Sequence, residues 1–425
     1  MKFEPTLHKL SNGVTVILDP MDLETACVKI AFKTGSIDEK PNEYGITHFC
    51  EHMFCKGSKR FPTKKERTDF LNNHGGTSDA VTSPMRLRFH GRIIAENLNV
   101  LIDVLADMLE NALFDEKQVE IERGAILDEL RRGLDNPDRV MYEFGMKNIF
   151  NTYVPNGLLT LGNPENIKSF TIKDLREYSH RRMSAKNCTV TISGRIDSKD
   201  DVLAKLEKAL AFLPTHDVTQ IIDLNYTPCV AHCPSDKNKN VKLAIVFQDI
   251  FQDTFENLYE SKCLSRFERF LLRELQEVIR NQNGLVYGVR GVAYGFPNNG
   301  CCGYGTETSP ENIARVVALM AQTAYRVYTE NPINQQELDK MFNLCRLGDA
   351  DFLESSTARN DKLNEFYLWY NRLYDFAEGV KMTKSITPED VVKYSCGIFD
   401  TPMSIITYGA DFDADLKQIW IDNFK

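Results

Sequence analysis

One order of strands and helices occurs twice along the 425-residue chain, and this repeat limits the folds open to it. In the first half, strand-like sequence over 27–36 leads into a helix that carries the letters HFCEH. In the second half, strand-like sequence over 241–247 leads into a helical stretch over 259–280. Further strand-like sequence and then a helical run follow in each half. The sequence therefore predicts two domains of related fold.

The two halves also close in the same way. Thr171 and Thr387 each precede a helical stretch and are followed three residues later by an aspartate, which is typical of a helix start. The strand-like segments CTVTISG and MSIITYG come next. We therefore predict α+β domains over 1–220 and 235–425, joined within the polar stretch 215–240, each of a plausible size for a domain.

The letters HFCEH place His48 and His52 four residues apart, with Glu51 directly before the second histidine. On a helix, positions i and i+4 lie on one face, so both imidazoles can reach one metal ion. Glu51 lies in the same turn and can approach the open side of that metal. This H-x-x-E-H order reverses the commoner zinc-peptidase motif. A catalytic zinc also needs a third protein ligand and an open position for water.

An acidic helix predicted over 119–134 can supply that third ligand. Glu122 and Glu129 are seven residues apart, nearly two helical turns, so the two carboxylates point the same way. Apolar residues around them are expected to hold the helix against a core: Ile121, Ala125, Ile126 and Leu127. Inward-facing carboxylates need a partner because a buried unpaired charge is costly, and a metal ion is such a partner.

The HFCEH motif, followed by E-x6-E, and the segment GITHFCEHMFCKGSKRFP resemble the pitrilysin/insulinase-type zinc metallopeptidases. The resemblance implies that His48, His52 and Glu129 bind one zinc ion per chain and that Glu51 is the general base. It also implies that Glu122 supports the active site without binding the metal. The chemistry agrees, because zinc lowers the pKa of bound water to about 7 and a nearby carboxylate can then take its proton.

The chain length resembles that of the short, two-domain subfamily that includes the mitochondrial processing peptidase and bacterial relatives. The resemblance implies two homologous domains, each a mainly antiparallel β-sheet packed against helices, which together form half of a clamshell. It implies a partner chain as well, either a second copy in a homodimer or a related metal-free chain in a heterodimer. The segment SKCLSRFERFLLRE stands where the first half has its motif and contains no histidine, so one zinc site is expected, in the N-terminal domain.

A segment of the second half resembles a substrate-binding region of the family. Arg280 and Tyr287 are similar in position to the arginine and tyrosine of the family's R-E-K-x-G-L-A-Y segment, which reach towards substrate. An arginine can donate to carbonyl groups, and a tyrosine hydroxyl can stabilise a developing oxyanion. The ordinary alternative is an arginine at a helix C-terminus and a tyrosine in a strand.

A second substrate-binding segment departs from the family's pattern. Asp79, Ala80, Val81 and Thr82 stand where relatives carry N-A-aromatic-T on an edge strand that holds substrate. An ionised aspartate cannot donate a hydrogen bond, and valine offers no ring for stacking. Pairing of substrate with the strand backbone can persist, because backbone groups carry it. We therefore expect these four residues to contact substrate with an altered preference.

Composition excludes several other classes of function. The net charge of −9 argues against binding of nucleic acid. The sequence has no signal-peptide pattern at its start and no run of about 18 apolar residues, so no membrane span is expected. The eleven cysteines show no disulfide framework and are expected to be reduced thiols. A cytoplasmic location follows as a prediction.

The sequence thus predicts a zinc metalloendopeptidase that cleaves short or unfolded polypeptides with a water molecule activated by Glu51. Two alternatives belong to other classes. The chain could be a non-catalytic structural or partner subunit of a processing-peptidase-like complex, although such subunits usually lose motif residues. It could also be a zinc-binding interaction module, although closed structural zinc sites use four protein ligands and are rich in cysteine.

Overall fold

The computed structural model describes the chain except for residues 1, 153, 221–223, 252–253 and 297–298. The chain forms two compact units of three segments each. The first unit contains Met1–Leu134, Val154–Ile222 and Leu347–Phe376, and the second contains Asp135–Tyr153, Asp223–Arg346 and Ala377–Lys425. The consecutive domains 1–220 and 235–425 stay a prediction, and the units differ from them in two exchanged segments, 135–153 and 347–376.

The first unit is built on a six-stranded sheet in the order β1-β2-β6-β3-β5-β4. The strands β2 and β6 are parallel, and all other neighbours in this sheet are antiparallel. The bounds of the strands are β1 Thr6–Lys9, β2 Thr15–Pro20, β3 Thr25–Phe32, β4 Gly76–Thr82, β5 Leu87–Ile94 and β6 Cys188–Gly194.

The second unit repeats this topology in a five-stranded sheet of order β7-β11-β8-β10-β9. Each strand takes the place of the strand numbered five lower in the first sheet, and again one neighbouring pair, β7 and β11, is parallel. The bounds are β7 Val230–Pro234, β8 Val241–Gln248, β9 Val289–Phe296, β10 Asn299–Thr308 and β11 Met403–Gly409. The predicted repeat of two mainly antiparallel, helix-packed sheets is therefore confirmed.

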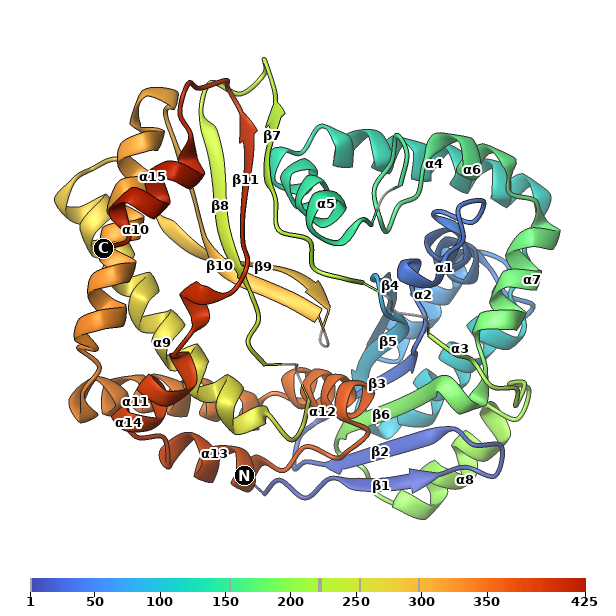
Figure 1. Ribbon diagram of the computed structural model, residues 1–425. Coiled ribbons are helices and arrows are strands. Elements are labelled where there is room, and N and C mark those ends of the chain that lie inside the picture. Colours follow the sequence, from blue (N-terminus) through green and yellow to red (C-terminus); the bar gives the residue numbers. More distant parts are fainter. Residues whose placement is uncertain (1, 153, 221–223, 252–253, 297–298) are drawn as a thin grey trace. The chain divides into compact units, whose positions relative to one another are not determined.

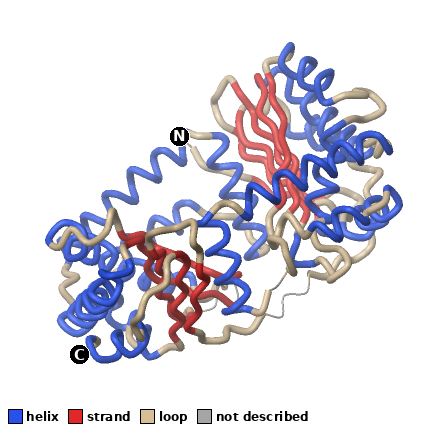
Figure 2. The backbone as a smooth tube through the Cα atoms, turned by 90° about the horizontal axis from the view of Figure 1, so that it is seen from above, coloured by secondary structure: helices blue, strands red, loops and turns tan. Residues whose placement is uncertain are grey.

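Helices flank both sheets, as Figure 2 shows by colour. The helices of the first unit are α1 Ile46–Lys56, α2 Lys64–Asn73, α3 Leu98–Glu110, α4 Glu116–Leu134, α6 Pro164–Ser169, α7 Ile172–Arg182, α8 Lys199–Ala209 and α12 Ser356–Tyr370. The second unit contains α5 Pro137–Phe150, α9 Leu258–Leu275, α10 Ile313–Glu330, α14 Pro388–Ser395 and α15 Leu416–Asn423. Residues of both units occur in two further helices, α11 Gln335–Glu354 and α13 Phe376–Lys384.

The two faces of the first sheet differ in chemistry because side chains alternate along each strand. One face of β3 presents Val28 and Ile30, which belong to the apolar core beneath α1 and α3. The opposite face presents Cys27 and Lys29, and α12 packs against this polar side over β2, β3 and β6 (Figure 1). A strand covered on both sides is buried along nearly its whole length, as β3 is.

Helices α12 and α5 each pack on a sheet formed mainly by the other half of the chain. On α12, the guanidinium of Arg359 donates to the Asp19 carboxylate at 2.7 Å, and the side-chain amide of Asn360 donates to the Thr191 carbonyl at 2.8 Å. Helix α5 lies against β7, β9 and β11 of the second sheet, where the ring of Tyr142 stacks on Tyr294 at 5.5 Å. Polar contacts thus predominate under α12, and ring stacking contributes under α5.

Helix α4 carries the predicted acidic pair, and its packing agrees with the expected one at Ile126 and Leu127 but not at two other positions. The buried residues are Val119, Glu122, Ile126 and Leu130, spaced by three or four as one helical face requires. The prediction that Ile121 and Ala125 pack against the core was wrong, because these positions lie on the opposite side; Ile121 is 51% exposed. Glu122 therefore belongs to the inward face of α4.

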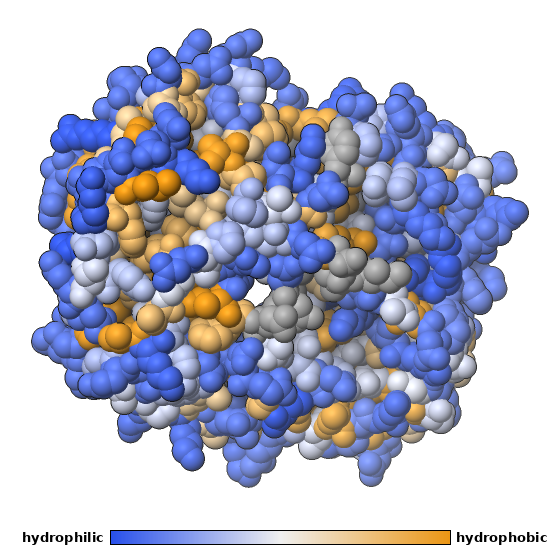
Figure 3. All heavy atoms as spheres, viewed as in Figure 1, coloured by the Kyte–Doolittle hydropathy of each residue, from blue (hydrophilic) through white to orange (hydrophobic). Residues whose placement is uncertain are grey.

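The surface seen in Figure 3 is mostly hydrophilic, with apolar side chains in separate patches. All eleven cysteines are free thiols, as expected from their scatter along the sequence. Among the described residues, no helix is both long and apolar enough to cross a membrane.

Candidate active site

Helix α1, which carries the HFCEH motif, is fixed at its N-terminus by a buried carboxylate. Gly45 precedes the helix with φ of 93°, a left-handed conformation that favours glycine. The Glu39 carboxylate accepts hydrogen bonds from the backbone N–H groups of Gly45 at 2.7 Å and Thr47 at 2.9 Å. Burial raises the pKa of Glu39 to about 8, although these hydrogen bonds act against the rise. Glu39 thereby satisfies two backbone donors of the first turn.

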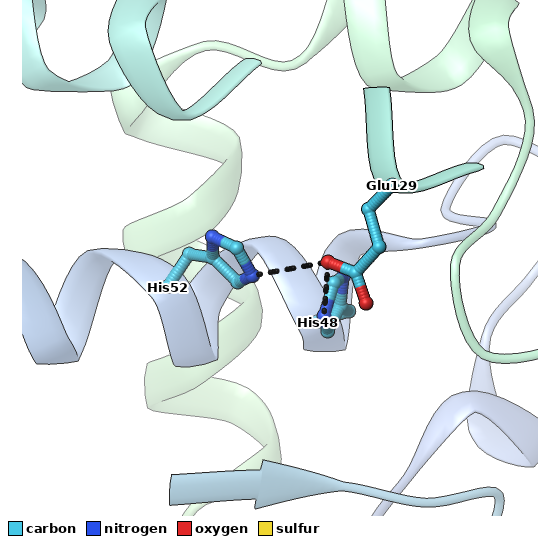
Figure 4. A group of neighbouring side chains, drawn as sticks. All are labelled: His48, His52 and Glu129. Atoms are coloured by element: carbon cyan, nitrogen blue, oxygen red, sulfur yellow. Dashed lines mark ion pairs between the residues drawn. The ribbon is translucent and has the colours of Figure 1, made fainter. Parts of the chain in front are cut away.

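The side chains of the three predicted metal ligands lie close together, two of them on α1 and the third on α4. Figure 4 shows the rings of His48 and His52 on α1 directed towards the carboxylate of Glu129 on α4. The Nε2 atoms of His48 and His52 lie 3.7 Å and 3.8 Å from Glu129 Oε2. Among the described residues, these three form the one group of three His, Cys, Asp or Glu side chains whose ligand atoms all lie within 4.8 Å of one another.

The donor set and its spacing fit a zinc ion. Two imidazole nitrogens and a carboxylate oxygen are ordinary zinc ligands, and ligands bound at about 2.1 Å with tetrahedral angles stand about 3.4 Å apart. The separations of 3.7 Å and 3.8 Å need to close by only a few tenths of an ångström. With three protein ligands, the fourth position is open, as a catalytic zinc site requires.

The predicted supporting residue Glu122 contacts Nδ1 of His52, the ring nitrogen that does not face Glu129. Its carboxylate is 1% exposed and accepts a hydrogen bond from His52 Nδ1 at 2.8 Å. Its other oxygen pairs with the Lys56 ammonium at 2.7 Å. Burial alone would raise the pKa of Glu122, but the hydrogen bonds from His52 and Lys56 outweigh it and hold the pKa below the usual range. An ionised Glu122 keeps the proton of His52 on Nδ1 and leaves Nε2 as the ligand atom.

The predicted general base Glu51 lies on the same helix and contacts the edge strand. Its carboxylate accepts a hydrogen bond from the Thr82 hydroxyl at 2.8 Å. Burial raises the pKa of Glu51, while the hydrogen bond from Thr82 and the charge of His52 lower it. A carboxylate with a raised pKa is suited to take a proton from water near neutral pH.

The four predicted substrate residues of 79–82 lie on β4, the outer strand of the six-stranded sheet. Ala80 is buried in the core, whereas Asp79 is exposed on the opposite face and accepts a hydrogen bond from the Ala80 backbone N–H at 3.0 Å. Val81 lies on the same face as Asp79, and Thr82 reaches Glu51. Along the outer edge of β4, backbone groups can pair with an added strand.

The predicted pair Arg280 and Tyr287 belongs to the second unit. Arg280 lies in a π-helical segment, Gln276–Gln282, that continues α9, and Tyr287 lies in the loop before β9 rather than in a strand. The guanidinium of Arg280 stands 5.4 Å from the centre of the Tyr287 ring, which is 92% exposed. The approach of this pair to substrate stays a prediction.

Sequence reasoning missed two residues that organise the site. Lys56 follows His52 by four positions on α1, so helical spacing could have placed it beside the same partner. Glu39 lies before the helix in an irregular stretch, and its hydrogen bonds to Gly45 and Thr47 have no signal in the sequence.

A repeated α+β fold, with a three-donor cluster and an adjacent glutamate on one repeat, is the arrangement expected of a zinc-peptidase family. The comparisons with known proteins agree. The family model described as insulinase (peptidase family M16) matches residues 15–160, and the model described as peptidase M16 inactive domain matches residues 169–344. The chain belongs to the insulinase family, peptidase family M16.

Individual relatives are distant but extend over much of the chain. An uncharacterized zinc protease of Rickettsia bellii is 23% identical over 411 residues, which cover 96% of this chain and 98% of that protein. A probable mitochondrial-processing peptidase subunit beta of Arabidopsis thaliana is 29% identical over 217 residues, 51% of this chain and 40% of that protein. A solved protease structure from Helicobacter pylori has a TM-score of 0.82 at 18% identity and covers 96% of this chain and 100% of that chain, which establishes a shared fold.

Proposed function

We propose that the protein is a zinc-dependent endopeptidase that cleaves short or unfolded polypeptides. The observation that carries the proposal is the convergence of His48, His52 and Glu129 within 4.8 Å, with Glu51 on the same helix. These three side chains would hold one zinc ion per chain. The names of relatives as zinc proteases support the choice of metal.

In this proposal, Glu51, Glu122 and Thr82 have separate tasks. Zinc, when bound, supplies a Lewis acid that lowers the pKa of water and polarises a carbonyl oxygen. Glu51 takes the proton of the attacking water and later gives it to the leaving amine. Glu122 holds the ring of His52 in one orientation and one tautomer. Thr82 orients Glu51 through its hydroxyl.

Substrate would bind as an extended strand beside β4. Backbone pairing along the outer edge of this strand gives affinity that does not depend on sequence, which suits unfolded polypeptides. Asp79 and Val81 would contact the substrate side chains that point to their face of the sheet. In the second unit, Arg280 and Tyr287 would add substrate contacts through a guanidinium and a phenol hydroxyl.

We further propose that two chains act together, as a homodimer or as a heterodimer with a related metal-free chain, each chain forming half of a clamshell. The word "subunit" in the name of the Arabidopsis relative supports a partner. A cytoplasmic location and the absence of nucleic-acid binding stay predictions from composition.

The test is cleavage of a mixed library of unstructured peptides by the wild type and by Glu51→Gln, with bound zinc measured in both. We expect cutting by the wild type alone and about one zinc per chain in each protein. Glu116→Gln, an exposed glutamate in the first turn of α4, is the matched control and should cut like the wild type.

Zinc in both proteins without cutting by either would favour the alternative, a non-catalytic partner subunit. Repeating the assay with a co-purified partner chain separates that alternative from an enzyme that needs its partner. Cleavage by Glu51→Gln at the wild-type rate would refute the role of Glu51.

A further inference from the structure

The polar face of the first sheet carries a row of basic side chains that the proposed peptidase does not use. The register pairs Lys29 of β3 with His90 of β5, and Cys27 of β3 with Arg92 of β5. Arg88, two residues before His90, points to the same face. The apolar core beneath α1 lies on the other face, so these bases are on the side of the sheet away from the zinc ligands.

These side chains surround a cavity of about 350 Å³ that α12 helps to close. Strand β4 contributes Thr77 and Asp79 to its lining, and α12 contributes Thr357, Asn360 and Asp361. All of these residues belong to the first unit. The volume exceeds that of one water molecule, about 30 Å³, roughly tenfold, so the cavity has room for a small ligand.

The acidic side chains of the lining do not neutralise its bases. Lys29, whose side chain is 4% exposed, forms a close ion pair with Asp361. The carboxylate of Asp361 is then 4.0 Å from the Arg88 guanidinium, the outer limit for an ion pair. Asp79 accepts a hydrogen bond from the neighbouring Ala80 backbone. Arg88 thus shares Asp361 with Lys29, and Glu365, whose charge also acts on Arg88, is paired with Arg86 at 2.9 Å.

The bases also repel one another. Burial lowers the pKa of Lys29 to about 7, and the charge of Arg88 is the next cause. Burial lowers the pKa of His90 as well, followed by the charges of Arg88 and Lys29. The Nδ1 atom of His90 is buried and has no hydrogen-bond partner among the described residues. A bound anion would favour the charged forms of Lys29 and His90, and the buried Nδ1 atom of His90 could hydrogen-bond to it.

We propose that this cavity binds a small oxyanion, a phosphate or carboxylate group, through Arg88, Lys29 and His90. The planar guanidinium of Arg88 matches two oxygens of such a group, and Lys29 and His90 can each donate a hydrogen bond to a bound anion in their protonated forms. The anion can be free inorganic phosphate or the carboxylate of a peptide. Because Thr77 and Asp79 of the outer strand line the cavity, a peptide beside β4 would have side chains next to it. Binding of free phosphate does not depend on the proposed peptidase activity.

The test is calorimetric titration with inorganic phosphate and, separately, with a pentapeptide that has a free C-terminal carboxylate, all at constant ionic strength. The same pentapeptide with a C-terminal amide is the control ligand. We expect saturable binding by the wild type of phosphate, of the free-carboxylate peptide or of both. The amide should bind more weakly than the free-carboxylate peptide, because it can pair with β4 but lacks the anionic group. Phosphate alone identifies a free anion as the ligand, and the peptide alone identifies a peptide carboxylate.

Three variants locate the binding to the cavity. Arg88→Gln should weaken binding about tenfold or more, because it removes a charged hydrogen-bond donor. Arg269→Gln, at an exposed arginine of α9 in the second unit, should bind like the wild type. Asp361→Asn should bind more tightly, because it removes the carboxylate that competes for Lys29 and Arg88. A gain in affinity cannot result from misfolding.

The proposal is overturned if the wild type binds neither ligand, or if Arg88→Gln binds as tightly as the wild type. It is also overturned if Asp361→Asn, with a native circular-dichroism spectrum, binds more weakly. Peptide cleavage by the wild type is measured in a separate assay. Absence of anion binding can therefore be distinguished from absence of peptidase activity.

Discussion

Replacement of Glu122 by glutamine tests how the site prepares His52 for a metal. The glutamine side chain has nearly the same size, so it should enter the same buried position on α4. Its amide oxygen can still accept from His52 Nδ1, but its NH₂ group then faces the Lys56 ammonium, donor against donor. The hydrogen bond to His52 also loses its charge.

The expected loss of zinc affinity in Glu122→Gln follows from the contacts of Glu122 with His52 and Lys56. Residues that hold a metal-binding histidine in orientation typically contribute 10- to 100-fold in metal affinity, which corresponds to about 1.4–2.7 kcal/mol. The distances of 2.8 Å and 2.7 Å are those of strong, charge-assisted hydrogen bonds, and Glu122 is almost fully buried, so we expect the upper part of that range. The free energy of unfolding of Glu122→Gln should also be lower than that of the wild type, because Lys56 loses its partner.

Competition for zinc against a chromophoric chelator measures the effect directly. Glu120→Gln is the matched control, since Glu120 lies two positions earlier on α4, is exposed and hydrogen-bonds to Arg123. Its zinc affinity should stay within about twofold of the wild type, as for an exposed ion pair. Adding Lys56→Met to Glu122→Gln removes the clash of donors and should restore part of the affinity. Wild-type zinc affinity in Glu122→Gln would refute the role assigned to this residue.

Two further predictions concern buried ionisable groups outside the predicted metal ligands. The folded-state pKa of Glu39 is about 8 against 4.5 for an ordinary glutamate, so the folded chain binds more protons and stability should fall as pH rises from about 5 to 8. Urea unfolding of Glu39→Gln across this range should show a smaller slope, and an unchanged slope would contradict the assignment. Arg359→Met leaves Asp19 buried without its partner and should lower the free energy of unfolding by about 3–5 kcal/mol. Adding Asp19→Asn should recover much of this loss; if Arg359→Met unfolds at the wild-type denaturant concentration, the ion pair is not needed for stability.

Local patterns in the sequence were sufficient for much of the fold. The segments CTVTISG and MSIITYG form β6 and β11 with the predicted ends, because their β-branched residues suit buried strands. Thr171 and Thr387 both cap helices through hydrogen bonds with the aspartate three residues on. These features depend on neighbours within a few residues, which sequence spacing reveals.

The spacing of His48 and His52 was sufficient to place both on one helical face, whereas the choice of Glu129 rather than Glu122 as the third ligand came from the family resemblance. Contacts between distant segments were not predictable in this way. Arg359 meets Asp19 across 340 positions, and no local pattern indicates that a helix with polar side chains will cover a polar face of the sheet. Glu39 was missed for the same reason, because its partners are backbone groups.

Helix α5 packs on the second sheet and α12 packs on the first. During synthesis, each unit is therefore complete only when a helix from the other half of the chain is present. Helix α12 begins at Ser356, so the chain must leave the ribosome beyond this residue before Asp19 and the carbonyl of Thr191 find their partners. Until then, a nascent N-terminal half has the metal ligands but a sheet with one uncovered polar face. A protein truncated at the join near residue 222 would therefore be left in this unfinished state. Under the proposed function, the half that carries the predicted metal ligands would complete its fold, and become able to cleave peptides, only after α12 has been made.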